Sequence, residues 1–262
     1  MENYVAFPGL GLTLNISPVA FTVFGKEIYW YGIIIAAGLI IAMLLSISLE
    51  KHTLLPKDTV LDIVLYATIP AIICARLYYC IFKFADYKDN LVDVFKIWEG
   101  GIAIYGAVIG AVLTAYIYCR VKKIDWKSAF DTCIIGVITG QCIGRWGNFV
   151  NKEAYGTETN LPWRMEIYRG NTPVCVHPTF LYESLWNFAG IFVLLYINRH
   201  KKLCGETFFS YLIWYGTGRA FIEGLRTDSL YLGPVRISQL VAAATAIAGM
   251  VLIAYYRKRN TK

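Results

Sequence analysis

Charged residues are scarce in this chain: they make up 16% of its 262 positions, while 57% are hydrophobic and the mean hydropathy is +0.50. This composition excludes an ordinary soluble domain, whose surface needs more charge. The formal charge of +7 does not indicate nucleic-acid binding either, because the lysines and arginines lie in short loops rather than on one basic face. An anionic membrane surface explains them better, so we expect no nucleic-acid partner.

Residues that hold metals and cofactors are also few. Two of the three histidines, His52 and His200, lie in short loops, and the seven cysteines form no CxxC pair. Most of the cysteines lie in apolar stretches, where a reduced thiol behaves as a small hydrophobic side chain. The sequence also has no glycine-rich nucleotide loop. We therefore expect neither a metal nor a separate cofactor.

Seven apolar stretches are each long enough to cross a bilayer, which takes roughly 17 to 25 residues. They cover residues 30–49, 60–82, 102–119, 129–146, 178–197, 206–224 and 237–256. Residues 1–29 are interrupted by Pro8, Gly9 and Pro18 and do not resemble an export signal. The sequence thus predicts an all-α integral membrane protein, in which an N-terminal interfacial arm (1–29) precedes a domain of seven transmembrane helices (30–262).

Lysine and arginine gather in alternate loops, and this pattern predicts the orientation. Loops 120–128 and 198–205 are basic, whereas the connections at about 83–101, 147–177 and 225–236 are longer and more thinly charged. The C-terminal tail is basic as well, through Arg257, Lys258, Arg259 and Lys262. The positive-inside rule places the C-terminus in the cytoplasm and, with an odd number of spans, the N-terminus outside.

On this topology the intramembrane polar residues fall in the outward halves of the helices, with Asp131 as the main exception. A charge in the middle of a span costs about 2.5 to 3.5 kcal/mol on insertion scales, so a group of them indicates a task or a set of partners. The outward set comprises Tyr31, Arg76, Tyr105, Arg145, His177, Glu183, Arg219, Glu223 and Arg226.

The segment at the end of the fourth span, 144–156, is dense in polar residues. Arg145 and Asn148 are three positions apart, so they share a face if the helix continues. A guanidinium beside an amide suits a phosphate, because arginine makes bidentate contacts with phosphate oxygens. The alternative is an arginine that snorkels to the lipid headgroups above a polar helix cap.

In the sixth span, Arg219, Glu223 and Arg226 form a charged row at helical spacing. Gly216 and Gly218 lie beside it and permit the close approach of another helix or of a lipid headgroup. The two arginines outnumber the carboxylate, which favours an anionic ligand. The alternative, which we prefer for Glu223, is a structural salt bridge between neighbouring turns.

The fifth span follows His177 and carries Glu183 within about two turns. A lone histidine at a helix start is more often a boundary residue than a catalyst, whereas an unpaired carboxylate at that depth is costly. Glu183 therefore needs an arginine from another span or an incoming proton. In the third span, Gly106 and Gly110 favour tight helix packing, and the hydroxyl of Tyr105 needs either the polar cluster or a backbone acceptor.

Together these residues resemble the prolipoprotein diacylglyceryl transferases, a family of bacterial plasma-membrane enzymes, over nearly the whole chain. The most specific element runs from Gly144 to Gly156 and contains Arg145, Asn148, Phe149, Asn151 and Glu153. Supporting elements are Trp30-Tyr31-Gly32, the glycine-rich start of the third span, His177-Pro178-Thr179 with Tyr182-Glu183, and Tyr215-Gly216 with Arg219, Glu223 and Arg226.

The resemblance implies transfer of the diacylglyceryl group of phosphatidylglycerol to the thiol of the lipobox cysteine in a preprolipoprotein signal peptide. The products would be a thioether-linked lipid and glycerol 1-phosphate, in the first step of bacterial lipoprotein maturation. It also implies a multi-pass protein of the plasma (inner) membrane, with the active site toward the outer leaflet. The expected partners are phosphatidylglycerol, preprolipoproteins and membrane lipid.

Residue roles follow from this chemistry, in which the displaced phosphate gains negative charge. We expect Arg145 and Arg219 to stabilise that charge, because electrostatic stabilisation is usually the largest catalytic contribution. We expect Glu153 or Glu183 to accept the thiol proton through water. The residues expected to bind the lipid or its headgroup are Arg145, Asn148, Asn151, Gly156, Tyr31, Arg76, His177, Glu223 and Arg226.

One position departs from the family pattern, because Tyr105 stands where many members have a histidine that has been proposed as the base. A tyrosine hydroxyl is a poor base at neutral pH. A free cysteine has a pKa of about 8.5, so a small fraction is already thiolate at pH ~7. A strong base is thus dispensable, and we expect Tyr105 to align the thiol or the phosphate by hydrogen bonding.

Two other classes of protein would use intramembrane arginines in the same way. A transporter or flippase for an anionic solute or lipid usually has a midplane site and paired repeats with broken helices, and the sequence shows no internal repeat. A non-catalytic lipid-binding scaffold would not need so many charges in one place.

The hydroxyl of Tyr105 is open to a direct test. We predict that Tyr105→Phe, assayed in membranes with a lipobox peptide, loses a substantial part of the transfer activity because the aligning hydrogen bond is gone. Turnover at the wild-type rate would rule out this role.

Overall fold

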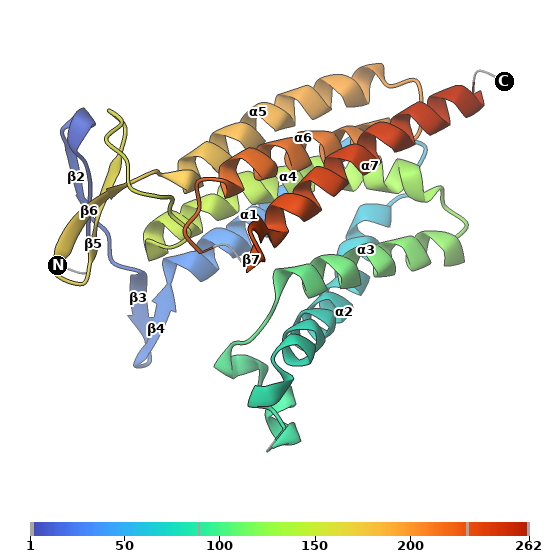
Figure 1. The fold of residues 1–262 in the computed structure, drawn as a ribbon. Coiled ribbons are helices and arrows are strands. Elements are labelled where there is room, and N and C mark those ends of the chain that lie inside the picture. The colour runs from blue at the N-terminus through green and yellow to red at the C-terminus, as the bar shows by residue number, and fades with distance from the viewer. Residues whose placement is uncertain (1–2, 89, 229–230, 261–262) are drawn as a thin grey trace. The chain divides into compact units, whose positions relative to one another are not determined.

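The computed structural model describes residues 3–88, 90–228 and 231–260 and is mostly helical (Figure 1). Within these ranges, seven α-helices follow the seven predicted stretches. They are α1 (Trp30–Glu50), α2 (Thr59–Phe82), α3 (Ile104–Val121), α4 (Trp126–Asn151), α5 (Thr179–His200), α6 (Glu206–Glu223) and α7 (Ile237–Asn260). The predicted bounds are close, except that α4 continues past residue 146 to Asn151. Lys262, counted in the basic tail, lies outside the described residues.

Five of these helices, α1, α2, α3, α5 and α7, are long and apolar enough to cross a membrane. The other two, α4 and α6, carry charged residues such as Arg145 and Arg219 in the apolar stretch. The chain is therefore consistent with a multi-pass membrane protein. The count of seven spans and their direction stay predictions.

The all-α prediction is wrong in one respect, because the arm 1–29 and the connection 147–177 contain strands. Strands β1 (Tyr4–Phe7), β2 (Leu12–Asn15), β5 (Met165–Arg169) and β6 (Thr172–Val176) form an antiparallel sheet in the order β2-β1-β5-β6. Two short hairpins, β3 (Val19–Val23) with β4 (Lys26–Tyr29) and β7 (Tyr231–Leu232) with β8 (Val235–Arg236), complete the strands. The central pairing of β1 with β5 joins segments about 160 residues apart, which local sequence patterns do not reveal.

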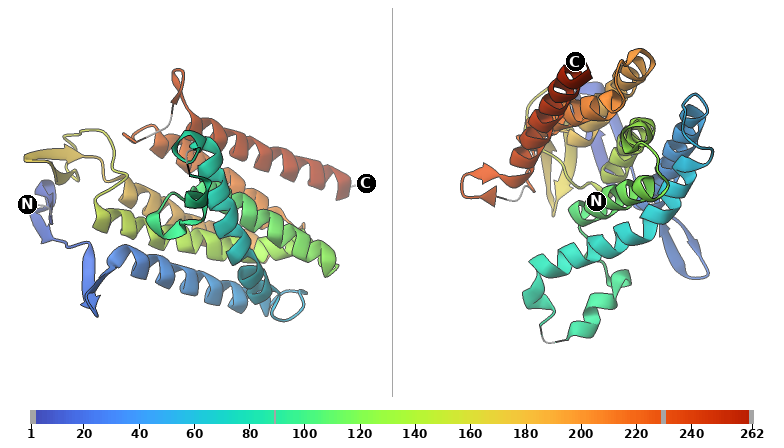
Figure 2. Two further views of the ribbon diagram at one scale, coloured as in Figure 1. Left: turned by 90° about the horizontal axis from the view of Figure 1, so that it is seen from below. Right: turned by 90° about the vertical axis from the view of Figure 1, so that its right-hand side faces the viewer.

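The chain divides into two compact units, one containing the described residues up to Leu45 and from Ile134 onward, the other Ser46–Cys133. In the first unit, α5, α6 and α7 pack side by side, with α6 in contact with both neighbours (Figures 1 and 2). In the second unit, α2 packs along α3, and short 3-10 helices η2 (Phe84–Asp86), η3 (Leu91–Phe95) and η4 (Ile97–Glu99) lie between them in the chain. The N-terminal 3-10 helix η1 (Pro8–Leu10) connects β1 to β2.

The sheet of the first unit is anchored to the ends of two helices. Val5, Ile167 and Val176 of the sheet share one buried cluster with Phe149 of α4 and Phe180 of α5. The rings of Phe149 and Phe180 stack with centroids 4.5 Å apart. This cluster fixes the last turn of α4 against the first turn of α5, where the predicted functional residues lie.

Glycines permit the close helix contacts in both units. A Cβ on Gly216 of α6 would lie 2.5 Å from the carbonyl oxygen of Ala242 in α7, and one on Gly218 would overlap the ring of Trp186 in α5. Both glycines of the sixth span therefore serve helix packing. In the second unit, a Cβ on Gly110 of α3 would lie 2.8 Å from the carbonyl oxygen of Pro70 in α2, and one on Gly106 would lie 2.3 Å from that of Cys74. The predicted tight packing of the third span is confirmed.

Candidate active site

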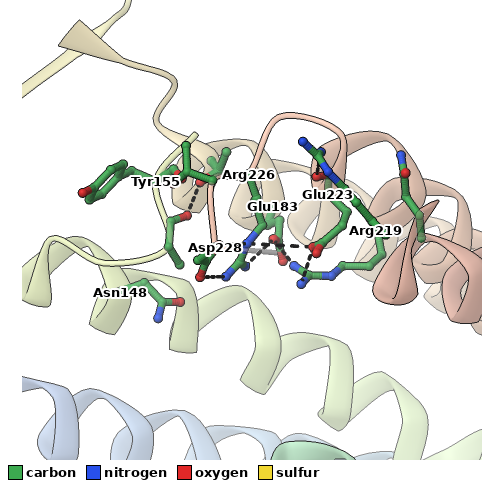
Figure 3. Close-up of polar contacts among 12 residues, drawn as sticks. Asn148, Tyr155, Glu183, Arg219, Glu223, Arg226 and Asp228 are labelled. Atoms are coloured by element: carbon green, nitrogen blue, oxygen red, sulfur yellow. Dashed lines mark hydrogen bonds and ion pairs between the residues drawn. The ribbon is translucent and has the colours of Figure 1, made fainter. Parts of the chain in front are cut away.

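The buried carboxylate of Glu183 lies among three arginines where α4 stops and α5 begins. Figure 3 shows two of them, Arg219 and Arg226, beside Glu183. Glu183 of α5 is 4% exposed. Its Oε2 forms an ion pair with Nη2 of Arg145, and its Oε1 accepts a hydrogen bond of 2.6 Å from Nη1 of Arg219. Nη1 of Arg226 lies 3.7 Å from the same Oε1. Of the two alternatives for Glu183, an arginine of another span or an incoming proton, the structure shows the arginines. Arg145 points inward to this carboxylate.

A second buried carboxylate, Glu223, ends α6 and is 1% exposed. Its Oε2 forms an ion pair with Nη2 of Arg219 at 2.6 Å, although the angles are not those of a hydrogen bond. Nε of Arg226 lies 3.8 Å from the same oxygen. The backbone carbonyl of Glu223 accepts a hydrogen bond from Nη1 of Arg236. The preferred interpretation of Glu223 as a structural salt-bridge partner agrees with these contacts, since its carboxylate bridges two arginines.

Arg226 lies beyond the end of α6, so the charged row of the sixth span does not continue on one helical face. Its Nε and Nη2 donate to the two carboxylate oxygens of Asp228, at 2.9 and 2.7 Å. This hydrogen bonding from Arg226 holds the pKa of Asp228 below its usual range, so the pair is ionised at neutral pH. The three arginines around Glu183 thus face three carboxylates, those of Glu183, Glu223 and Asp228. The charges of these six residues balance, so the positive excess that we expected from the residues of the sixth span is absent among them.

Sequence reasoning missed Asp228. The available signal was an acidic residue two positions after Arg226 in a connection predicted to face outward. Such a residue is common in loops, and only the fold shows that its two oxygens match the guanidinium of Arg226.

The continuation of α4 to Asn151 places Arg145 and Asn148 on one face, as the spacing predicts. Nη1 of Arg145 donates to Oδ1 of Asn148 at 3.2 Å, and Nδ2 of Asn148 donates to Oε1 of Glu153 at 2.8 Å. Glu153 is exposed, and the half-buried Asn151 ends the helix. A continuous polar chain therefore runs from the buried Glu183, through Arg145 and Asn148, to an exposed carboxylate.

Gly156 joins three segments at a point with no room for a side chain. Its N–H donates to the carbonyl of His177 at 3.0 Å, and the N–H of Thr157 donates to the carbonyl of Leu225 at 2.7 Å. A Cβ on Gly156 would lie 2.7 Å from Cβ of His177 and 3.0 Å from the carbonyl oxygen of Leu225. Gly156 therefore fixes the loop after α4 against the segments that carry Glu183 and Arg226.

His177 takes part in a short hydrogen-bonded chain at the start of α5. Its Nδ1 lies 3.2 Å from the hydroxyl of Tyr182, which accepts a hydrogen bond of 2.8 Å from Nε1 of Trp163. Burial lowers the pKa of His177, which keeps the ring neutral at pH 7. Because the hydroxyl accepts from Trp163, its own proton is free to bond to Nδ1. These contacts agree with the interpretation of His177 as a boundary residue, and Trp163 is a partner that sequence reasoning missed.

Tyr31 of α1 lies beside the same turn of α4. A Cβ on Gly147 would be 2.8 Å from Cδ2 of the Tyr31 ring, so the ring rests on this glycine. Gly147 lies between Arg145 and Asn148 in the chain. The structure therefore brings Tyr31, Arg145, Asn148, Asn151, Glu153, Gly156, His177, Glu183, Arg219, Glu223 and Arg226 into one region of the first unit.

Comparison with known proteins supports the resemblance. The family model described as prolipoprotein diacylglyceryl transferase matches residues 18–255. The phosphatidylglycerol–prolipoprotein diacylglyceryl transferase of Clostridioides difficile is 45% identical over 92% of this chain and 96% of that protein. Those of Finegoldia magna and Listeria welshimeri are each 46% identical, over 93% and 92% of this chain and 97% and 90% of theirs. The chain belongs to the prolipoprotein diacylglyceryl transferase family.

Two of the residues expected to act in the site, Arg76 and Tyr105, belong to the second unit. Arg76 is 5% exposed and donates to four backbone carbonyls, those of Asp93, Val94, Gly100 and Gly101, at 2.5 to 2.9 Å. These bonds fold the connection between α2 and α3 around its guanidinium. The binding role expected of Arg76 stays a prediction.

Tyr105 lies in the first turn of α3. Its ring contacts that of Tyr78 in α2, with centroids 6.3 Å apart, and its side chain is partly exposed. Its expected role as an aligning hydroxyl stays a prediction.

The ion cluster gives a prediction for stability. Glu183→Gln removes the charge that compensates Arg145 and Arg219, whose side chains are 21% and 16% exposed. We predict that the free energy of unfolding falls by about 3 kcal/mol, as when one partner of a buried pair is removed. Thermal or denaturant unfolding of the purified protein in detergent measures this. Glu153→Gln, which changes an exposed carboxylate in the same way, is the control and is expected to unfold like the wild type; equal stabilities of all three proteins would contradict the account.

Proposed function

We propose that this chain transfers the diacylglyceryl group of phosphatidylglycerol to the lipobox cysteine of a preprolipoprotein, the first step of bacterial lipoprotein maturation. The observation that carries the proposal is the meeting of Arg145, Arg219 and Arg226 around Glu183, at one end of a bundle of apolar helices. Family membership gives the reaction, since the relatives bear the name of this transferase. The arginine cluster gives a place where the phosphate of the lipid could bind.

The reaction exchanges one bond for another. The cysteine sulfur attacks the carbon of the diacylglycerol unit that is bonded to the phosphate oxygen. A C–S bond forms as this C–O bond breaks. The electron pair of that C–O bond goes to the phosphate oxygen, and glycerol 1-phosphate leaves. The thiol proton goes to an acceptor. Because the leaving phosphate gains negative charge, fixed cations beside it lower the barrier.

Arg145 and Arg219 are suited to this task. Each approaches Glu183 through one terminal nitrogen, and a guanidinium has five N–H groups in a fixed fork. The contacts to Glu183, Asn148 and Glu223 hold the two forks in a set orientation before a lipid arrives. Preorganised donors of this kind need little rearrangement in the transition state. In this proposal Glu183 positions the arginines.

The geometry favours Glu153 over Glu183 as the proton acceptor. Both carboxylate oxygens of Glu183 contact guanidinium groups, so a proton arriving there would have to disrupt an ion pair. Glu153 is exposed and joined to Arg145 through the amide of Asn148. A water held at Glu153 would pass the thiol proton to its carboxylate.

The remaining residues support the headgroup and the shape of the site. Asn148, Asn151 and Arg226 offer amide and guanidinium groups for the glycerol and phosphate oxygens. Gly156 and His177 fix the loops that carry them, Tyr31 packs on Gly147 in the last turns of α4, and Glu223 orients Arg219. Phosphatidylglycerol would enter from the lipid between helices.

We further propose that the site faces the outer leaflet of the bacterial plasma membrane and that all seven helices cross it. The basic ends of α5 and α7, with Arg199 and with Arg257, Lys258 and Arg259, support a cytoplasmic position for the opposite end of the bundle. The arginine cluster lies at the end where α5 begins and α6 stops, away from these basic turns. In α4 and α6, contacts among the charges themselves would lower the cost of burying them in lipid.

The decisive assay measures glycerol phosphate release by the purified chain in phosphatidylglycerol vesicles. We predict release that depends on a lipobox peptide and stops when the peptide cysteine is replaced by serine. A transporter or a lipid-binding scaffold would bind the lipid without releasing glycerol phosphate. Lipid binding with no peptide-dependent release would therefore reject the transferase function.

The proposed proton acceptor has its own test. We predict that Glu153→Gln lowers the rate about 100-fold at neutral pH, the usual scale for loss of a general base. The deficit should shrink as the pH rises toward ~9, because the peptide thiol, with a pKa near ~8.5, then ionises without help. Rates of wild type, Glu153→Gln and Glu153→Asp measured across this range check the prediction. A deficit that is the same at every pH would contradict the role of Glu153.

A further inference from the structure

The helix that carries Glu183 is hydrogen-bonded to α4 by the next residue. The hydroxyl of Ser184 donates to the carbonyl of Cys142 at 3.0 Å and accepts from Nε1 of Trp146 at 3.2 Å. The thiol of Cys142 donates in turn to the carbonyl of Ser184 at 3.3 Å. Cys142 and Trp146 lie on either side of Arg145 in the sequence of α4. Ser184 thus connects the turn that carries Glu183 to the turn that carries its partner.

On its other side α5 is joined to α6 by two tryptophans. Nε1 of Trp186 donates to the carbonyl of Trp214 at 3.0 Å, and Nε1 of Trp214 donates to the carbonyl of Trp186 at 3.1 Å. Their rings stack with centroids 4.5 Å apart. Each ring lies against a glycine of the opposite helix, Trp186 over Gly218 and Trp214 over Gly190, where a Cβ would overlap it. The two contacts are reciprocal, so neither helix can slide or turn without breaking both.

We propose that Ser184 and the Trp186–Trp214 pair are positioning residues that set the register of Glu183 between Arg145 and Arg219. Ser184 acts on the α4 side and the tryptophans act on the α5–α6 contact. The inference rests on the proposed function for its catalytic consequence, although the register itself is a property of the fold. None of these three residues is expected to touch the lipid or the thiol.

The lipid around these helices explains why such contacts set their register. In lipid there is little hydrophobic driving force between helices, so packing and interhelical hydrogen bonds determine how they align. The Glu183 carboxylate must reach guanidinium groups on two different helices at once. Ser184 is one residue and Trp186 three residues from Glu183, within about one helical turn. A small slip of α5 would therefore misplace the arginines that we assign to the phosphate.

Ser184 permits a clean substitution series with a matched control. Ser184→Ala removes the hydroxyl and Ser184→Thr retains it. Thr207→Val removes a different interhelical hydrogen bond of α5, from Thr207 of α6 to Asn198 near the end of α5 far from Glu183. We expect Ser184→Ala to lower kcat about 10-fold, since small misplacements of reacting groups have large effects. KM for phosphatidylglycerol should change little, Ser184→Thr should restore most of kcat, and Thr207→Val should resemble the wild type.

Trp186→Phe keeps a stacked ring but removes the N–H that bonds to Trp214, and we expect the same fall in kcat with little change in KM. The proposal would be overturned if the kcat values of Ser184→Ala and Trp186→Phe equalled that of the Thr207→Val control. So would a loss in Ser184→Ala that Ser184→Thr leaves unrestored.

A double-mutant cycle makes the test independent of activity. Ser184→Ala and Glu183→Gln, alone and together, are compared by thermal unfolding, because residues that act through one contact are not additive. We expect the double variant to lose clearly less unfolding free energy than the sum of the two single losses. For Thr207→Val with Glu183→Gln, we expect the two losses to add. Additivity in both cycles overturns the positioning role. If the wild type shows no peptide-dependent release of glycerol phosphate, only the proposed function is rejected. The double-mutant cycle still tests whether Ser184 sets the register of Glu183.

Discussion

The contact on which the site depends is the ion pairing of Glu183 with Arg145 and Arg219. The carboxylate lies on α5, and its two partners lie on α4 and α6, so one side chain ties three helices together. A charge at this depth has a high cost unless it is paired. The pairing therefore explains how charged residues persist in α4 and α6, the two helices that fall short of the apolar composition of the other five.

The surrounding structure keeps this contact in one geometry. The stacked rings of Phe149 and Phe180 fix the ends of α4 and α5, and Gly156 draws the loop after α4 against His177 and Leu225. Asp228 and Glu223 then hold Arg226 and Arg219 from the side of α6. These contacts hold the guanidinium groups of Arg145 and Arg219 in a set orientation. In the proposed function, that orientation is the preorganisation that a reaction with a departing phosphate requires.

Hydrophobic stretches and charge spacing were sufficient to predict the seven helices and the shared face of Arg145 and Asn148. They also indicated that Glu183 needs an arginine or a proton, and the structure shows arginines. These features are local, or follow from the cost of charge in lipid. The sheet was not predicted, because β1 pairs with β5 across most of the chain. Asp228 and Trp163 were missed for a similar reason: each is an ordinary loop residue until the fold brings it to Arg226 or Tyr182. The tasks assigned to Arg76 and Tyr105 rest on sequence alone.

The central claim is that Arg145 and Arg219 act together on the phosphate as it leaves. It is tested most directly by the kinetics of Arg145→Lys, Arg219→Lys and the double variant, measured as peptide-dependent glycerol phosphate release from phosphatidylglycerol vesicles. Lysine keeps the charge but lacks the planar fork. The account predicts that each single variant lowers kcat by about 100-fold or more with little change in KM, and that the double variant is less impaired than the product of the two. A rise in KM with an unchanged kcat, or wild-type kinetics in either single variant, would contradict it.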